Sequence, residues 1–273
     1  MTPFSVLLSI YHKEQASFLH EAMSSIWTKQ LLQPTEIILV QDGPLTPELN
    51  EAIAEWQHII GSSFITIQLP ENVGLGKALN QGLKHCQYEL VARMDTDDIC
   101  LPTRFHEQVT YLHVHPEVAV LGTSIQEFDK DPSKLISLKS VPTRQADIVE
   151  YAKKRSPFNH PSVMYRKSVI EALGGYQHHL FMEDYNLWLR IIAAGYQVAN
   201  LEEVLLHMRA GQAMLSRRRG WVYVKSEWKM VQLKKQIGFQ GYTRSIPVFF
   251  LRALPRLLPS SWLTIIYRKL RQT

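Results

Sequence analysis

Three carboxylates crowd together in the segment Asp95-Thr96-Asp97-Asp98, directly after a short apolar run. Carboxylates this close repel one another and raise each other's pKa unless a cation lies among them. Oxygen ligands without His or Cys suit Mg²⁺ or Mn²⁺, and Mg²⁺ is commonly held by one or two carboxylates together with substrate phosphates. The segment therefore predicts a divalent cation held between the protein and a diphosphate. The alternative is an acidic turn that caps the following helix, because Asp is a favoured N-cap residue.

Other polar residues follow other apolar runs. Asp42 ends such a run and offers an acceptor to a nucleobase or ribose. Gly74-Leu75-Gly76-Lys77 opens a predicted helix, and a glycine-rich turn with a helix N-terminus and a lysine suits phosphate, although an ordinary capped helix also explains it. Glu183 and Asp184 begin another predicted helix, where the helix dipole alone stabilises acidic side chains.

Alternating strands and helices must position these groups. Short apolar runs predict strands at 4–10, 36–40, 64–68, 90–94, 118–122 and 162–165, with 125–128 extending or pairing with the fifth. Apolar residues at helical spacing predict helices at 17–29, 47–60, 74–83, 104–113, 145–153, 169–173 and 183–194. This pattern is typical of an α/β fold with a mostly parallel sheet that is covered on both faces. Such sheets bind ligands at the carboxyl ends of their strands, where Tyr11, Asp42, Asn72 and Asp95 stand.

The composition favours a folded protein with an uneven charge distribution. Of the 273 residues, 45% are apolar, which is enough for one large core or a core and an appendage. Cys86 and Cys100 form no disulfide framework and no zinc motif, so we expect reduced thiols in a cytoplasmic protein. The N-terminus lacks the basic region of a signal peptide, and no run approaches the roughly 20 apolar residues that span a bilayer.

The C-terminal segment is basic and predicted to be helical. Residues 217–273 hold 13 Lys/Arg and one acidic residue, whereas residues 1–216 carry a balance of −7. Apolar clusters alternate with basic residues after 246, and Trp262 and Tyr267 suit a membrane interface. The segment thus predicts an interfacial association with an anionic membrane surface, to which each basic residue adds about 1 kcal/mol. The alternative is a helical tail that packs on the main domain. Pro247, Pro255 and Pro259 are expected to break it into short pieces.

The order of the motifs resembles the family 2 glycosyltransferases, which have the two-lobed, nucleotide-binding GT-A fold. The matching segments are SVLLSIYHKE, IILVQDG, ENVGLGKALNQGL, LVARMDTDD and FMEDYNLWLRIIAAGY, and together they cover about residues 3–210. The resemblance implies a GT-A catalytic domain at 1–215, with a nucleotide-binding half at 1–100 and an acceptor-binding half at 101–215. A separate helical segment, 216–273, would follow it.

The resemblance also implies roles for particular residues. Asp184 would be the general base, with Glu183 beside it. Asp97 and Asp95 would hold Mn²⁺ or Mg²⁺, and His207 is a further candidate ligand. The nucleotide-sugar site would comprise Ser9, Tyr11, Glu14, Asp42, Asn72, Gly74, Lys77, Arg93, Asp95, Asp97, His160, Arg217 and Arg218. The last two arginines would neutralise the diphosphate, unless they only begin the basic tail.

The activity that the resemblance implies is an inverting transfer of one hexose from a UDP-sugar to an acceptor hydroxyl. Processive relatives carry a QxxRW motif and membrane spans, which are missing from this sequence, so one sugar is expected per acceptor. The implied acceptor is a polyprenyl-diphosphate-linked saccharide in bacterial O-antigen, lipopolysaccharide, capsule or exopolysaccharide assembly. The enzyme would then work in the cytoplasm, on the inner face of the cytoplasmic membrane.

Two other functions fit the sequence less well. A nucleic-acid-binding protein would fit the pI of 9.1, but the tail lacks a known nucleic-acid motif, and acidic strand ends repel phosphate unless a metal ion is present. We therefore expect no nucleic-acid partner. A sugar nucleotidyltransferase would use a similar sheet and cation, but that family usually opens with a long glycine-rich loop, whereas residues 9–18 contain no glycine.

Overall fold

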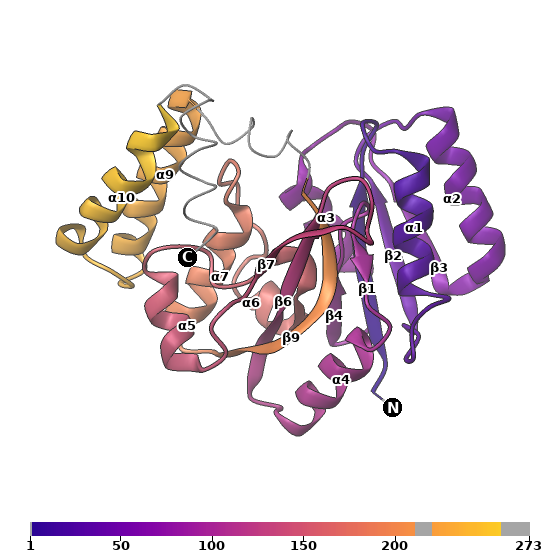
Figure 1. The fold of residues 1–273 in the computed structure, drawn as a ribbon, viewed down its shortest axis with the longest axis horizontal. Coiled ribbons are helices and arrows are strands. Elements are labelled where there is room, and N and C mark those ends of the chain that lie inside the picture. Colours follow the sequence, from indigo (N-terminus) through magenta and orange to yellow (C-terminus); the bar gives the residue numbers. More distant parts are fainter. Residues whose placement is uncertain (1, 211–219, 258–273) are drawn as a thin grey trace.

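The computed structural model describes residues 2–210 and 220–257, and the strands of these ranges form one curled sheet (Figure 1). Its order is β3-β2-β1-β4-β8-β6-β9-β5, and β7 pairs with β6. The strands are β1 (Phe4–Ile10), β2 (Glu36–Gln41), β3 (Phe64–Gln68), β4 (Leu90–Arg93), β5 (Ile99–Cys100), β6 (Val118–Phe128), β7 (Leu135–Lys139), β8 (Met164–Arg166) and β9 (Gln197–Arg209). The helices are α1 (Ala16–Ile26), α2 (Pro47–Ile60), α3 (Leu75–His85), α4 (Arg104–Val114), α5 (Gln145–Ala152), α6 (Lys167–Ala172), α7 (Glu183–Ala193), α9 (Gly220–Gln236) and α10 (Tyr242–Arg256).

The first four strands form the parallel half of the sheet. β1 lies between β2 and β4, and β3 pairs with β2, all in parallel register. Beyond β4 the sheet is mixed, because β8 runs antiparallel to both β4 and β6 while β9 runs parallel to β6. The polar segments that follow β1, β2 and β4 consequently meet at one edge of the sheet.

Two apolar cores lie on opposite faces of the sheet. Alternate residues of β1 divide between them: Leu8 and its even-numbered neighbours face α1, α2 and α4, whereas Leu7 faces α3. The second core also receives side chains from α5, α6, α7 and α9. The predicted α/β class, with helices on both faces, is therefore confirmed.

The structure differs from the sequence-based expectations in several places. β5 and β7 were not predicted, and the helix predicted at 17–29 ends at Ile26. β9 was not predicted, although it is one of the longest strands, and the strand predicted at 162–165 begins only at Met164 because residues His160–Ser162 form a short 3-10 turn. The two prolines within the described part of the tail do not break it: Pro247 and Pro255 both lie inside α10. Pro259, Trp262 and Tyr267 lie outside the described residues.

The C-terminal hairpin, which we define as α9 and α10, packs against the main body through buried polar contacts. Lys234 of α9 is buried and donates a hydrogen bond of 2.7 Å to the carbonyl of Lys153, just after α5. Arg252 of α10 forms an ion pair of 2.8 Å with Glu227 of α9 and also donates to the carbonyl of Lys154. No helix within the described ranges has both the length and the apolar character that crossing a bilayer requires.

We predict that replacing Gly82 of α3 by alanine destabilises the protein. A Cβ at this position would lie 2.4 Å from Cδ1 of Leu7 and 2.7 Å from Cγ2 of Val40, so α3 would have to move off the sheet. Overpacking of this kind costs about 1–3 kcal/mol of unfolding free energy, which denaturant titration would measure. Gln81→Ala, one residue earlier on the exposed side of α3, is the matched control and should change little. Equal stability of the two variants would contradict the close packing described here.

Candidate active site

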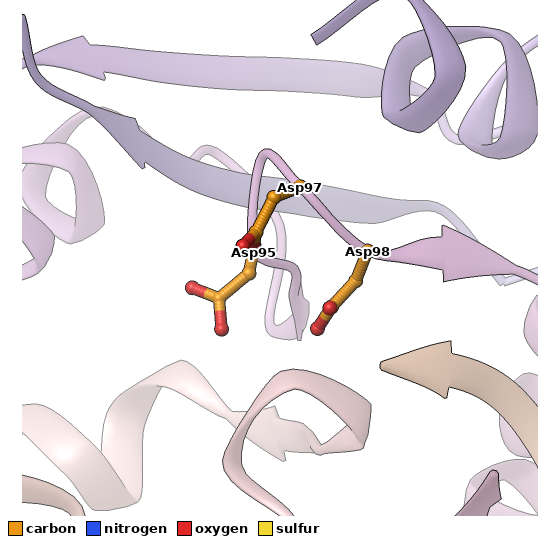
Figure 2. Close-up of side chains that lie close together, drawn as sticks. All are labelled: Asp95, Asp97 and Asp98. Atoms are coloured by element: carbon orange, nitrogen blue, oxygen red, sulfur yellow. The ribbon is translucent and has the colours of Figure 1, made fainter. Parts of the chain in front are cut away.

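The turn between β4 and β5 carries three aspartates whose side chains project to the same side (Figure 2). One carboxylate oxygen from each of Asp95, Asp97 and Asp98 lies within 4.8 Å of the others. Asp98 is 1% exposed, and its Oδ2 has no hydrogen-bond partner. A buried carboxylate oxygen without a partner needs a proton or a cation, so these residues fit a divalent cation with oxygen ligands.

Burial and mutual repulsion disturb the titration of this cluster. Burial, together with the charges of Asp95 and Glu14, raises the pKa of Asp97 to about 7. Burial raises the pKa of Asp98 well above its usual range, and Asp97 and Asp95 add to the effect. A divalent cation would remove the repulsion and would compete with the proton for the same oxygens.

Arg209, at the end of β9, binds the aspartate turn through hydrogen bonds from its backbone and its side chain. Its backbone N–H donates to Oδ1 of Asp98 at 2.8 Å, and its Nε donates to the carbonyl of Asp97 at 3.0 Å. Its guanidinium stacks 3.8 Å from the ring centre of Phe18 and pairs with Glu21 at 2.5 Å, both on α1. The turn is thus fixed between α1 and the far edge of the sheet.

Arg93 and Glu14 contact the same turn. Arg93 is buried and pairs with Asp95 through Nη2, while its Nε and Nη1 have no partner. Oγ1 of Thr96 donates to Oε2 of Glu14 at 3.3 Å, and burial raises the pKa of that glutamate. Both residues were expected at the nucleotide-sugar site, and the structure brings them to the aspartates.

Asp98 and His207 change the expected set of cation ligands. Asp98 belongs to the aspartate cluster, as the crowded motif suggested, although the resemblance implied only Asp95, Asp97 and His207 as ligands. His207 of β9 pairs with Ile99 of β5 and is half-buried. It does not belong to the cluster, the one group of three or more possible ligands found among the described residues, and its role as a ligand stays a prediction. Arg217 and Arg218 lie outside those residues.

Asp42 organises the loop that leads into α3. Its Oδ1 accepts a hydrogen bond of 2.7 Å from the backbone of Val73, and its Oδ2 accepts one of 3.1 Å from Gly74. Asn72 donates to the carbonyl of Asp42 at 3.1 Å. Gly43 permits this contact, since a Cβ there would lie 2.7 Å from the backbone nitrogen of Asn72. The carboxylate of Asp42 is therefore engaged with the protein, and its contact with a nucleobase stays a prediction.

The remaining residues of the expected nucleotide-sugar site are more open. Ser9 and Tyr11 are half-buried at the end of β1. Lys77 is exposed in the first turn of α3. Lys77 and Lys84 line an open hollow of about 570 Å³ that extends along α3 to Gly174. Their contacts with a nucleotide also stay predictions.

Tyr176 joins the two halves of the site, and sequence analysis missed it. Its backbone forms two hydrogen bonds of 2.8 Å with the side chain of Asn80 on α3. Arg190 of α7 fixes the preceding turn by donating to the carbonyl of Gly175 at 2.6 Å. The hydroxyl of Tyr176 lies 2.8 Å from Nε2 of His160. The glycine pair at 174–175, which closes α6, is the only signal in the sequence that the chain turns sharply here.

Glu183 and Asp184 reach this junction from the start of α7. A Cβ at Gly76 would lie 3.3 Å from Cγ of Glu183, so α7 begins against the first turn of α3. Burial raises the pKa of Glu183, and Asp184 adds to the effect. Burial raises the pKa of Tyr176, and the charges of Asp184 and Asp95 both contribute. Tyr176 therefore lies within electrostatic range of the candidate base and of the aspartate cluster.

Comparisons with known sequences give one consistent match. Residues 5–174 match the family model described as glycosyl transferase family 2. Amylovoran biosynthesis glycosyltransferase AmsE of Erwinia amylovora is 44% identical over 269 residues, which cover 98% of this chain and 99% of that protein. An Escherichia coli enzyme, UDP-Gal:alpha-D-GlcNAc-diphosphoundecaprenol beta-1,3-galactosyltransferase, is 38% identical over 97% of this chain and 95% of its own length.

Two solved structures share the fold. The S. aureus TarS 1-349 complex with UDP-GlcNAc superposes with a TM-score of 0.69 at 16% identity, over 92% of this chain and 74% of that one. The mannosyltransferase PcManGT from Pyrobaculum calidifontis, in complex with GDP-Man and Mn²⁺, gives 0.64 at 17% identity, over 100% and 81%. At these identities the likeness establishes the GT-A fold alone.

We predict that Asp97→Asn stabilises the metal-free protein and abolishes its binding of Mn²⁺. Because the pKa of Asp97 lies near 7 in the folded state, its ionisation disfavours folding progressively as the pH rises from about 4 to 7. The amide should therefore raise the unfolding free energy at pH 8 by on the order of 2 kcal/mol, and this gain should shrink as the pH is lowered toward 4. Thermal unfolding with and without Mn²⁺ would measure both effects. A loss of stability at pH 8 would contradict the repulsion described for the cluster.

Proposed function

This chain belongs to glycosyl transferase family 2 and is a glycosyltransferase, and we propose that it transfers one hexose from a UDP-sugar to a hydroxyl of a lipid-linked saccharide. One observation carries the proposal: the buried residue Tyr176 lies near both acidic groups, because Asp95 of the aspartate turn and Asp184 of α7 both raise its pKa, and a Cβ at Gly76 would touch both Tyr176 and Glu183. This arrangement supports a donor diphosphate at the aspartates and an acceptor hydroxyl at Asp184. The related E. coli galactosyltransferase makes UDP-galactose the first donor to test.

Asp95, Asp97 and Asp98 would hold the divalent cation together with the donor diphosphate. The cation supplies positive charge for the leaving nucleoside diphosphate. The protein's part is to keep the three carboxylates in place, through Arg209 and the ion pair of Arg93 with Asp95. A site fixed before the substrate arrives stabilises the developing charge without reorganisation. Three carboxylates fit Mg²⁺ and Mn²⁺ equally well. The tests below use Mn²⁺.

Asp184 would accept the proton of the acceptor hydroxyl as its oxygen attacks the anomeric carbon. The diphosphate would leave from the opposite face, so this single displacement inverts the anomeric centre. Glu183 is the poorer candidate because its Cγ would contact any side chain at Gly76, which places it against α3. Ser156 donates weakly to Oδ2 of Asp184 at 3.5 Å, which leaves the other oxygen for the acceptor.

We propose that the C-terminal hairpin brings the enzyme to the inner face of the cytoplasmic membrane. Its outer surface combines exposed apolar and basic side chains: Lys225, Lys229, Lys235, Arg244, Phe250, Leu251, Leu254 and Leu257. The hairpin's one acidic residue, Glu227, is buried in the ion pair with Arg252. An apolar surface with positive charge and no exposed acid suits an anionic bilayer and a lipid-linked acceptor in bacterial surface-polysaccharide assembly.

We predict that Asp184→Asn lowers kcat at least 1,000-fold while the dissociation constant of UDP with Mn²⁺ changes less than about threefold, because only the proton acceptor is lost. Isothermal titration and a UDP-release assay with UDP-galactose and N-acetylglucosaminyl diphosphoundecaprenol would measure the two quantities. Glu183→Gln is the matched control and should keep more activity. If Asp184→Asn retains near-normal turnover, Glu183 is the base and the assignment is wrong.

We predict that the double variant Leu251→Asp with Leu254→Asp lowers the fraction of protein bound to phosphatidylglycerol vesicles about tenfold or more. Both leucines are exposed on α10, and carboxylates there would face lipid and anionic headgroups. Co-sedimentation at low salt would measure binding. Leu31→Asp, an equally exposed leucine beyond α1, is the control and should bind as the wild type does. Unchanged binding of the double variant would contradict the role of α10.

A further inference from the structure

Phe181 has an unusual backbone conformation directly before the candidate base. Its φ of +67° makes it the only non-glycine residue in the described ranges that adopts the left-handed region. The N–H of Met182 donates to the carbonyl of His179 at 2.7 Å, so residues 179–182 form a tight turn with Phe181 at its third position. Glycine or asparagine normally occupies that position, and a bulky side chain there costs about 1–3 kcal/mol.

The surrounding structure holds this turn in place. Nε2 of His179 donates to the carbonyl of Ser226 on α9 at 2.9 Å, and Nδ1 accepts from the side-chain amide of Asn186 on α7 at 3.2 Å. The hydroxyl of Ser226 donates to the carbonyl of Leu180 at 2.5 Å. The turn is therefore bonded to α7 on one side and to α9 on the other.

The side chain of Phe181 is exposed to solvent rather than buried. It stacks on the buried ring of Tyr223 of α9, with centroids 5.8 Å apart and an interplanar angle of 18°, yet Phe181 remains 42% exposed. One face is thus backed by a second aromatic ring. A strained backbone, fixed by bonds from two helices, holds a large apolar side chain at the surface, where burial does not compensate the strain. Such strain persists at sites where the side chain has a function.

We propose that the ring of Phe181 is the platform on which the acceptor sugar stacks, an inference that rests on the proposed transfer to a saccharide. Asp184 stands three positions after Phe181, which places their Cα atoms at most about 10 Å apart. A sugar whose hydroxyl contacts Asp184 must lie within a ring's width of that carboxylate. The C–H face of a pyranose is apolar, and a planar aromatic ring with a supported back face buries it well.

Phe181→Gly tests the platform, because glycine adopts the same φ without strain and removes only the ring. With UDP-galactose as donor, two acceptors are compared: N-acetylglucosaminyl diphosphoundecaprenol and the soluble methyl glycoside of N-acetylglucosamine. We expect KM for both acceptors to rise roughly 3–10-fold, as for the loss of one aromatic contact. KM for the donor should be unchanged, and Phe181→Tyr, which keeps the ring, should restore the acceptor KM. Phe181→Asn, which also tolerates this conformation, replaces the glycine variant if that variant does not fold.

The outcomes separate this inference from the proposed function. A wild type that is active, together with an unchanged acceptor KM in Phe181→Gly, overturns the platform and leaves the transferase intact. A rise in KM confined to the lipid-linked acceptor would mean that the ring contacts the lipid, which also overturns it. A wild type that binds UDP with Mn²⁺ but glycosylates neither acceptor overturns the proposed acceptor class and the platform with it. Leu31→Ala is the control for a general loss of exposed apolar surface, because Leu31 is an exposed leucine beyond the C-terminal end of α1.

Discussion

The repulsion among three crowded carboxylates is the constraint around which the rest of the site is arranged. Asp95, Asp97 and Asp98 occupy a short turn, and burial makes their charges costly. The protein does not neutralise them fully, because Arg93 pairs with Asp95 alone. Instead, Arg209 fixes the turn through its backbone and guanidinium while leaving an oxygen of Asp98 without a partner. A site that is unfavourable when empty is, for the same reason, strongly favourable toward a divalent cation.

The region around Tyr176 and the start of α7 is held differently, by hydrogen bonds from polar side chains to backbone groups. Asn80 of α3 pairs with both backbone groups of Tyr176, Arg190 of α7 fixes the turn before it, and His179 with Ser226 fixes the turn before α7. These contacts join segments distant in sequence without relying on flexible apolar packing. The start of α7 is therefore oriented by α3 and by α9. α9, which belongs to the basic C-terminal segment, thus supports the main body of the protein as well as presenting its own outer surface.

The sequence predicts the parallel half well because its signals are local. The strand 64–68 and the helix 47–60 have the predicted bounds, since an apolar run or a helical period there ends at Pro, Gly or a clear cap. β9 is not predicted by the same analysis because its middle, Asn200–Glu203, is mostly polar, so the sequence shows no regular alternation of apolar and polar residues. In the structure, its pairing with β6 shifts register in this region. The roles of Tyr176 and Arg209 depend on contacts across 80 residues or more, which no local pattern reports. The local motif contains Asp98, but not the burial that leaves its Oδ2 without a hydrogen-bond partner. α10 continues through Pro247 in its first half and Pro255 near its end, although neither proline has an N–H to donate.

The pairing of β5 with β9 and of β8 with β4 has a consequence for recombination between relatives. β5, the last strand of the first half (residues 1–100), completes the far edge of the sheet beside β9, while β8 of the second half (101–215) lies beside β4 of the first. Arg104, just after β5, is buried and donates back to the carbonyl of Arg93. The two halves are therefore interleaved rather than adjacent. A chimera joined near residue 100 would put segments of two different relatives into both strand pairings and into the buried guanidinium contact at once, so altering side chains and loops disturbs this structure less than swapping halves.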